Sequence, residues 1–115
     1  MYRIKGVNVW PQAVEQVMFE FPEVDEYQVD LTSAADGADI ATIRFMPKTV
    51  LPENDRGAVS THITEELRRR IGLRFVLEPV AQGTLARSEY KAKRWRDERA
   101  YISQAARDAR KTTAL

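Results

Sequence analysis

Two short segments of the chain combine residue types that could act on a phosphate-bearing substrate. Residues 4–11 (IKGVNVWP) place Gly6 within a β-branched run, directly before a proline at which a helix can begin. A glycine inside a strand allows close approach to the backbone. Residues 83–94 (GTLARSEYKAKR) form a polar segment that ends in Lys91, Lys93 and Arg94. A lysine on such a loop can deliver a point charge to a phosphate.

Other common catalytic patterns are absent from the sequence. The single histidine, His62, has no neighbouring histidine, and the chain contains no cysteine, so thiolate zinc sites and a cysteine nucleophile are excluded. Neither a Gly-x-x-x-x-Gly-Lys-Ser/Thr loop nor a Gly-x-Gly-x-x-Gly motif occurs. Tyr27 and Phe45 are strand aromatics, which we expect in a core rather than on an RNA-binding surface. No metal site is predicted.

Length and composition indicate one soluble domain. The chain has 115 residues, of which 43% are hydrophobic and 30% charged, values that fit a packed core with a solvated surface. No apolar run approaches the roughly 20 residues of a membrane-spanning helix. The start, MYRIKG, has no apolar signal-peptide core. We therefore expect a cytoplasmic protein without membrane contact.

The charges are unevenly distributed along the chain. Lys and Arg number 9 against 13 Asp and Glu up to Gly83, but 9 against 4 from Thr84 onward. An anionic partner such as a nucleotide would therefore bind most favourably near the C-terminal quarter. A solvated basic helix explains the same excess.

Two other charge clusters have structural explanations. The acidic residues Glu23, Asp25 and Glu26 surround a turn, where solvation accounts for them. Arg68–Arg70 lie in the last turn of a helix, where positive charges interact favourably with the helix dipole.

The elements that would position these residues follow from periodicity. Arg3–Val9 is typical of a strand interrupted by Gly6. A first helix begins at Pro11 and is stopped by Pro22, and a second ends at Gly72. Their apolar faces are formed by Val14, Val17, Met18 and Phe21 in the first helix, and by Val59, Ile63, Leu67 and Ile71 in the second.

The strands are predicted from alternation. Tyr27–Thr32 and Ala41–Phe45 alternate apolar and polar residues around a turn, which predicts a hairpin. Phe75–Pro79 is a short apolar strand. A last helix is expected from about Trp95 to Arg110. The fold class is therefore α+β, a small mixed sheet with helices packed on it, in the ferredoxin-like order βαββαβ with an extra C-terminal helix.

The two segments resemble the C-terminal domain of adenylate-forming acyl-CoA ligases, and the phenylacetate-CoA ligase group in particular. The similar stretches are residues 4–24 (IKGVNVWPQAVEQVMFEFPEV), 27–32 (YQVDLT) and 83–99 (GTLARSEYKAKRWRDER). The last is similar to the family's lysine motif, Pro-Arg-Ser-Glu-Gly-Lys-Ala, with Ala86 and Tyr90 in place of the proline and the glycine. The resemblance implies a ligase C-terminal-type domain over residues 1–99 and a helical extension over 100–115.

The resemblance also implies a reaction and site residues. Such ligases join a carboxylic acid to AMP from ATP and then transfer the acyl group to coenzyme A, while the C-terminal domain swings as a lid between the two steps. Lys91 would be the catalytic lysine of adenylation, with Lys93 the neighbour that could be confused with it. Gly6, Val7 and Asn8 would line the tunnel for the pantetheine arm of CoA.

The expected partner is a large N-terminal adenylating domain, in cis or in trans, which would hold ATP with its Mg²⁺ and an aryl or acyl carboxylic acid. The resemblance leaves the acid unnamed, and the complete enzyme is expected as a homodimer. By this interpretation the chain alone is inactive. Two other classes stay open: a stand-alone ferredoxin-like module that binds a small ligand, and, ranked below it, a nucleic-acid binder using the basic helix.

Overall fold

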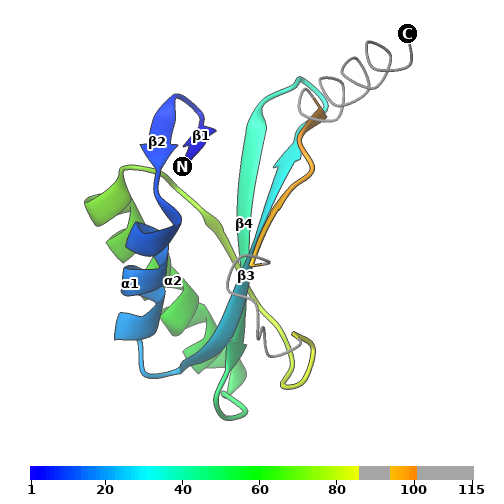
Figure 1. The fold of residues 1–115 in the computed structure, drawn as a ribbon. Helices are drawn as coiled ribbons and strands as arrows, with labels where there is room; N and C mark the ends of the chain where they lie inside the picture. Colours follow the sequence, from blue (N-terminus) through cyan, green and yellow to red (C-terminus); the bar gives the residue numbers. More distant parts are fainter. Residues whose placement is uncertain (86–93, 101–115) are drawn as a thin grey trace, which may run out of the picture.

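A computed structural model of the chain describes residues 1–85 and 94–100. Two helices lie on the same side of a sheet, and a separate small hairpin stands beside one end of it (Figure 1). The elements in chain order are β1 (Tyr2–Ile4), β2 (Val7–Val9), α1 (Pro11–Glu20), β3 (Val24–Ser33), β4 (Asp39–Pro47), α2 (Glu53–Ile71), β5 (Val76–Pro79) and β6 (Trp95–Asp97).

Four strands form the main sheet in the order β5-β4-β3-β6. The central strands β3 and β4 are antiparallel, with Val29 opposite Ile43, which confirms the predicted hairpin. The edge strands β5 and β6 each run parallel to their neighbour. The mixed α+β fold class is therefore confirmed.

Both helices follow the apolar spacing of their sequences. Helix α1 begins with Pro11 in its first turn and buries Val14, Val17 and Met18. Helix α2 buries Ile63 and Leu67. It ends at Gly72, whose φ of 86° is left-handed and whose N–H donates to the Arg68 carbonyl. Glycine adopts this conformation without a steric penalty, so it terminates the helix.

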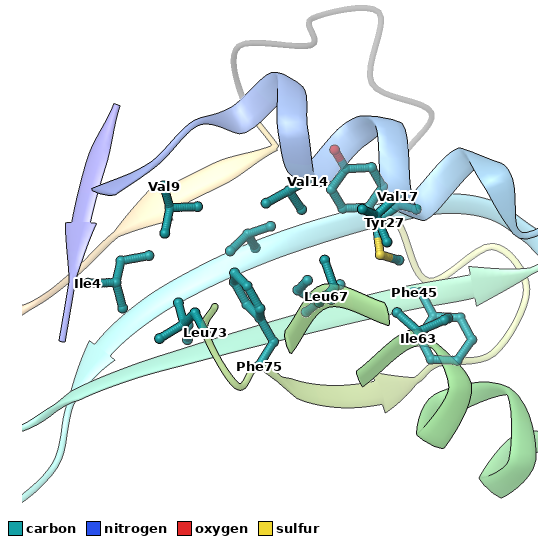
Figure 2. Close-up of a cluster of buried hydrophobic side chains, with 14 of the residues drawn as sticks. Ile4, Val9, Val14, Val17, Tyr27, Phe45, Ile63, Leu67, Leu73 and Phe75 are labelled. Atoms are coloured by element: carbon teal, nitrogen blue, oxygen red, sulfur yellow. The ribbon is translucent and has the colours of Figure 1, made fainter. Parts of the chain in front are cut away.

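One apolar core lies between the helices and the sheet (Figure 2). Tyr27 and Phe45 from the central strands are almost fully buried, as predicted, and Phe75 joins them. Ile4 and Val9 of the β1–β2 hairpin are also fully buried. The hairpin is thus anchored in the core by one residue from each strand.

The segment 3–9 is not the single strand that its sequence predicted. Strands β1 and β2 pair with each other in an antiparallel hairpin and stay outside the four-stranded sheet. The reason is that Lys5 and Gly6 both have positive φ, 49° and 77°, which reverses the chain instead of continuing a strand.

The expected start of a last helix at Trp95 is also wrong. Residues Trp95–Asp97 form β6, which pairs with Val29–Leu31 of β3. Stacking supports this placement, because the rings of Tyr2 and Trp95 are nearly parallel at a centroid distance of 4.6 Å. Nearly all of the predicted extension, residues 101–115, lies outside the described residues.

Candidate functional site

Gly6 occupies the turn of the β1–β2 hairpin. Its φ of 77° is a conformation that L side chains rarely adopt, and a Cβ placed there would meet nothing within 4 Å. The backbone conformation, rather than lack of space within the described residues, therefore requires glycine at this position. Gly6 therefore lies in a tight turn and not inside the strand that the sequence predicted.

The residues after Gly6 alternate in exposure along β2. Val7 packs against the core and is half-buried, Asn8 is exposed, and Val9 is fully buried. Gly6 in the turn and Asn8 in the middle of β2 are therefore accessible, while Val7 next to the turn and Val9 at the other end of β2 pack against the core. The three residues that sequence selected lie together at one exposed edge of the molecule.

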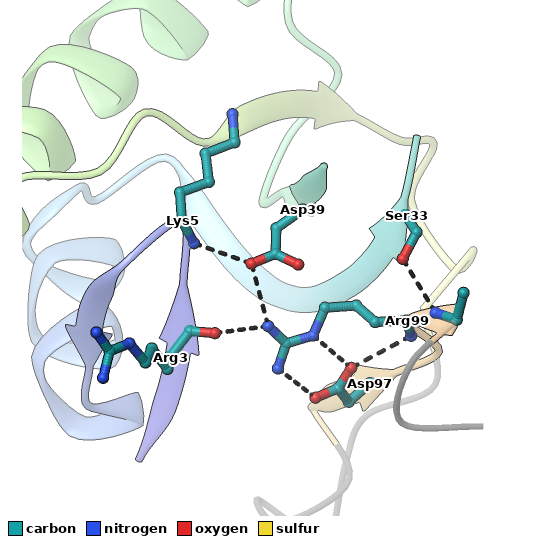
Figure 3. A network of polar contacts seen from close by, with 7 residues as sticks. Arg3, Lys5, Ser33, Asp39, Asp97 and Arg99 are labelled. Carbon is teal, nitrogen blue, oxygen red and sulfur yellow. Dashed lines mark hydrogen bonds and ion pairs between the residues drawn. The ribbon is translucent and has the colours of Figure 1, made fainter. Parts of the chain in front are cut away.

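A polar network connects the hairpin turn to the main sheet (Figure 3). The Lys5 backbone N–H donates to Oδ2 of Asp39, at the start of β4, at 2.9 Å. Arg99 Nη1 donates to the Arg3 carbonyl at 2.6 Å and lies 3.4 Å from the same Asp39 oxygen. Three segments, around residues 3–5, 39 and 99, therefore meet at one point.

Arg99 is the centre of this network and is only 3% exposed. It forms a two-pronged ion pair with Asp97, from Nε to Oδ1 at 2.8 Å and from Nη2 to Oδ2 at 2.6 Å. Hydrogen bonds from Arg99 hold the pKa of the Asp97 carboxyl below its ordinary value of 3.8. A buried guanidinium is tolerated only with such partners.

A second buried arginine lies at the C-terminal end of residues 83–94, the segment that carries Lys91 and Lys93 and is called the lysine segment below. Arg94 is 8% exposed and donates from Nε to Glu26 Oε1 at 2.8 Å and from Nη1 to Glu15 Oε1 at 3.3 Å. Its guanidinium also lies 5.1 Å from the ring centres of Phe19 and Tyr27. Burial raises the pKa of Tyr27 to about 12, although Arg94 opposes the shift.

The N-terminal end of the lysine segment is also fixed. Leu85 is 7% exposed, and the Gly83 N–H donates to the Met46 sulfur at 3.0 Å. Lys91 and Lys93 themselves lie in residues 86–93, outside the described part of the structure, so their predicted roles stay predictions. What the described residues provide is an anchored position on each side of that segment.

The remaining sequence candidates have structural explanations. His62 is exposed on α2. Arg69 pairs with Glu66, and Arg70 pairs with Glu20 of α1, as expected for cations near a helix end. Within residues 1–85 and 94–100, no group of three or more acidic or histidine side chains could hold a metal ion. No helix among these residues is long and apolar enough to cross a membrane.

Sequence reasoning missed the charged residues that hold the site. Glu26 was assigned to a solvated turn, but it is 8% exposed and pairs with Arg94. A register shift in β3 between Val24 and Glu26 interrupts the alternation, and both Glu26 and Tyr27 are buried. Asp39 and Arg99 carried no local signal. A carboxylate at a strand start and an arginine 60 residues later are ordinary surface residues by pattern.

Comparison with known proteins assigns the family. Residues 6–99 match the model of the AMP-binding enzyme C-terminal domain, and the chain therefore belongs to this family of ligase C-terminal domains. No curated protein matches the chain in sequence.

Solved structures show the same fold. A domain of phenylacetate-coenzyme A ligase from Bacteroides vulgatus matches with a TM-score of 0.77 and 26% identity, over 86% of this chain and 92% of that one. The 2-hydroxyisobutyryl-CoA ligase in complex with 2-HIB-AMP and CoA, in the thioesterification state, gives a TM-score of 0.84 at 19% identity. The alignment covers 96% of this chain, which spans only 24% of that ligase.

Proposed function

We propose that the chain is the lid domain of an AMP-forming acyl-CoA ligase, resembling phenylacetate-CoA ligase, which alternates between two orientations on a large adenylating domain. The observation that carries this proposal is the family match over residues 6–99, which includes both the Gly6 turn and the lysine segment. The similar 2-hydroxyisobutyryl-CoA ligase, about four times longer, was solved with 2-HIB-AMP and CoA. This supports an acyl-adenylate intermediate and CoA as the ligands of the proposed reaction.

In the first half-reaction, a carboxylate oxygen of the acid attacks the α-phosphorus of ATP, and pyrophosphate leaves with the electron pair of the broken P–O bond. We assign Lys91 to this step. Its ammonium would neutralise the negative charge that is shared between the acyl carboxylate and the α-phosphate in the transition state. Mg²⁺ would enter with ATP, on the adenylating domain.

In the second half-reaction, the thiol of CoA attacks the acyl carbon, loses its proton and expels AMP. We assign Gly6, Val7 and Asn8 to this step, lining the path of the pantetheine arm. The exposure of Gly6 in the turn and of Asn8 in β2 supports this assignment, because bare backbone and a polar side chain are available to a ligand there.

Placing the two functions in different segments fits domain alternation. The two ends of the lysine segment are fixed at Leu85 and Arg94, whereas the hairpin turn is fixed by Asp39 and Arg99. A lid that rotates as a body can then present one segment and withdraw the other.

The test uses the complete ligase that contains this chain. Lys91→Ala should lower acyl-adenylate formation, followed as pyrophosphate release, by about a hundred-fold or more. Thioester formation from added acyl-adenylate should be largely retained. Lys93→Ala is the matched control, since it removes an equal charge two residues away.

The opposite pattern, with Lys93→Ala lowering adenylation and Lys91→Ala not, would move the catalytic assignment to Lys93. Normal adenylation in both variants would remove the lysine segment from the mechanism. It would favour the stand-alone binding module considered from sequence.

A further inference from the structure

The β1–β2 hairpin needs an external support to hold its turn in one orientation. It is a two-stranded sheet with three residues in each strand, outside the main sheet. Isolated two-stranded hairpins are marginally stable in water. Ile4 and Val9 bury the strands in the core, but Lys5 and Gly6 project beyond these anchors and are exposed.

The turn contains an unusual backbone conformation beside Gly6. Among the described residues, Lys5 is the one non-glycine with positive φ, at 49°. Such a conformation is uncommon outside glycine, asparagine and aspartate, and it persists where the surroundings favour it. Here the surroundings include the Asp39 carboxylate, which accepts the hydrogen bond of the Lys5 N–H at 2.9 Å.

Asp39 is itself held by Arg99. The side chains of Asp39 and Arg99 are 15% and 4% exposed, so their interaction is little screened by water. Arg99 Nη1 lies 3.4 Å from Asp39 Oδ2 and donates to the carbonyl of Arg3 in β1 at 2.6 Å. One guanidinium nitrogen therefore contacts both the hairpin strand and the carboxylate that holds the turn.

Arg99 is in turn fixed to the main sheet. Asp97, at the end of β6, binds its Nε and Nη2 atoms, and β6 is paired with β3. The Ala100 N–H donates to the Ser33 hydroxyl at the end of β3, as Figure 3 shows. The path from the sheet to the turn is therefore continuous, through Asp97, Arg99 and Asp39 to the Lys5 amide.

We propose that Asp39 and Arg99 are positioning residues for thioester formation, which hold the Lys5–Gly6 turn so that the backbone of residues 6–8 faces the pantetheine arm of CoA. This inference rests on the proposed function. Neither residue is assigned a contact with substrate. Because small misplacements of a binding element are costly, loss of the support should weaken CoA use before it affects adenylation.

The enzymatic test measures both half-reactions in the complete ligase. Asp39→Ala should raise the KM for CoA by roughly tenfold or more, with pyrophosphate release nearly unchanged. Asp39→Asn should recover much of the loss, because its amide oxygen can still accept from the Lys5 N–H. Arg99→Lys, which lacks the planar fork, should resemble Asp39→Ala. Asp30→Asn is the matched control, since Asp30 pairs with Arg44 on β4 away from the turn.

Hydrogen exchange of the 115-residue chain gives a readout that does not depend on catalysis. Asp39→Ala should accelerate exchange at the Lys5 amide, while amides of β3 and β4 stay protected as in Asp30→Asn. Suppose that Asp39→Asn lost both half-reactions equally and its amides lost protection from hydrogen exchange throughout the chain. Asp39 and Arg99 would then have a purely structural role, and the proposal would be overturned.

An unchanged KM for CoA despite faster exchange at Lys5 would also overturn it, because the turn would then move without consequence. A wild-type ligase that forms no thioester would refute the proposed function instead. The exchange data would in that case still decide whether Asp39 holds the turn.

Discussion

At the residue scale, two buried arginines hold the two segments on which the proposed chemistry depends. Arg94 joins the end of the lysine segment to Glu26 of β3 and Glu15 of α1. Arg99, five positions later, joins the hairpin to Asp39 and Asp97. Because guanidinium groups donate in several fixed directions, each can connect elements that share no backbone hydrogen bonds.

Two substitutions of Gly6 can separate the effect of backbone strain at positive φ from the effect of an added side chain in the proposed CoA path. At a φ of 77°, leucine should cost about 1–2 kcal/mol of stability. Asparagine tolerates left-handed conformations far better and should leave the unfolding temperature nearly unchanged. In the complete ligase, Gly6→Asn should impair thioester formation and retain pyrophosphate release, because under the proposed function its side chain would enter the CoA path.

Gly6→Leu serves as the comparison, since it adds both strain and bulk. Thioester formation at the wild-type rate in Gly6→Asn would show that the position needs only a left-handed turn. That result would refute the assignment of Gly6 to the CoA path.

At the element scale, helix α2 shows how charge and end residues define a helix. Glu53 and Asp55 lie in its first turn and Arg68–Arg70 in its last, which complements the helix dipole at both ends. Gly57 lies inside the helix with an ordinary φ, whereas Gly72 ends it with a φ of 86°. The glycine inside α2 and the glycine directly after it therefore have opposite conformational requirements.

The same substitution should therefore change stability in opposite directions at these two positions. Gly57→Ala should raise the free energy of unfolding by roughly 0.5–1 kcal/mol, because alanine loses less backbone entropy in a helix and nothing lies within 4 Å of the new methyl group. Gly72→Ala should lower it by about 1–2 kcal/mol, because alanine is strained in the left-handed region. Urea unfolding of the chain measures both. Equal effects of the same sign would contradict this account of the helix end.

At the scale of the whole molecule, both helices of the described residues, 1–85 and 94–100, cover the same side of the sheet (Figure 1). On the other side, the half-exposed Asp30 accepts a hydrogen bond from Gln28 and forms an ion pair with Arg44. The described hollows are open to solvent, and one, of about 340 Å³, is lined by residues such as Lys5, Arg68 and Arg74. Tight nucleotide binding generally needs a concave, preorganised pocket.

We accordingly expect the 115-residue chain alone neither to bind ATP tightly nor to exchange pyrophosphate. Calorimetric titration with Mg–ATP should give no micromolar affinity, and addition of a matching adenylating domain should restore activity. Micromolar ATP binding by the chain alone would contradict the assignment of the nucleotide site to another domain.

The sequence by itself determined the elements whose signals are local. Apolar spacing in α1 and α2, the alternation in β3 and β4, and the glycine at the end of α2 all depend on residues within a few positions of each other. The two segments around Gly6 and Lys91 were sufficient to indicate the family, because their residue types and order are distinctive. These inferences required no knowledge of distant contacts.

Only the tertiary structure decided how distant residues meet. Trp95–Asp97 became a strand because β3 offered a free edge and Tyr2 a stacking partner, which outweighed the helical composition of the following tail. The pairs Glu26–Arg94 and Asp39–Arg99 join residues 68 and 60 positions apart. Local spacing cannot encode such pairs, because a buried charge is stabilised by whichever opposite charge the fold brings to it.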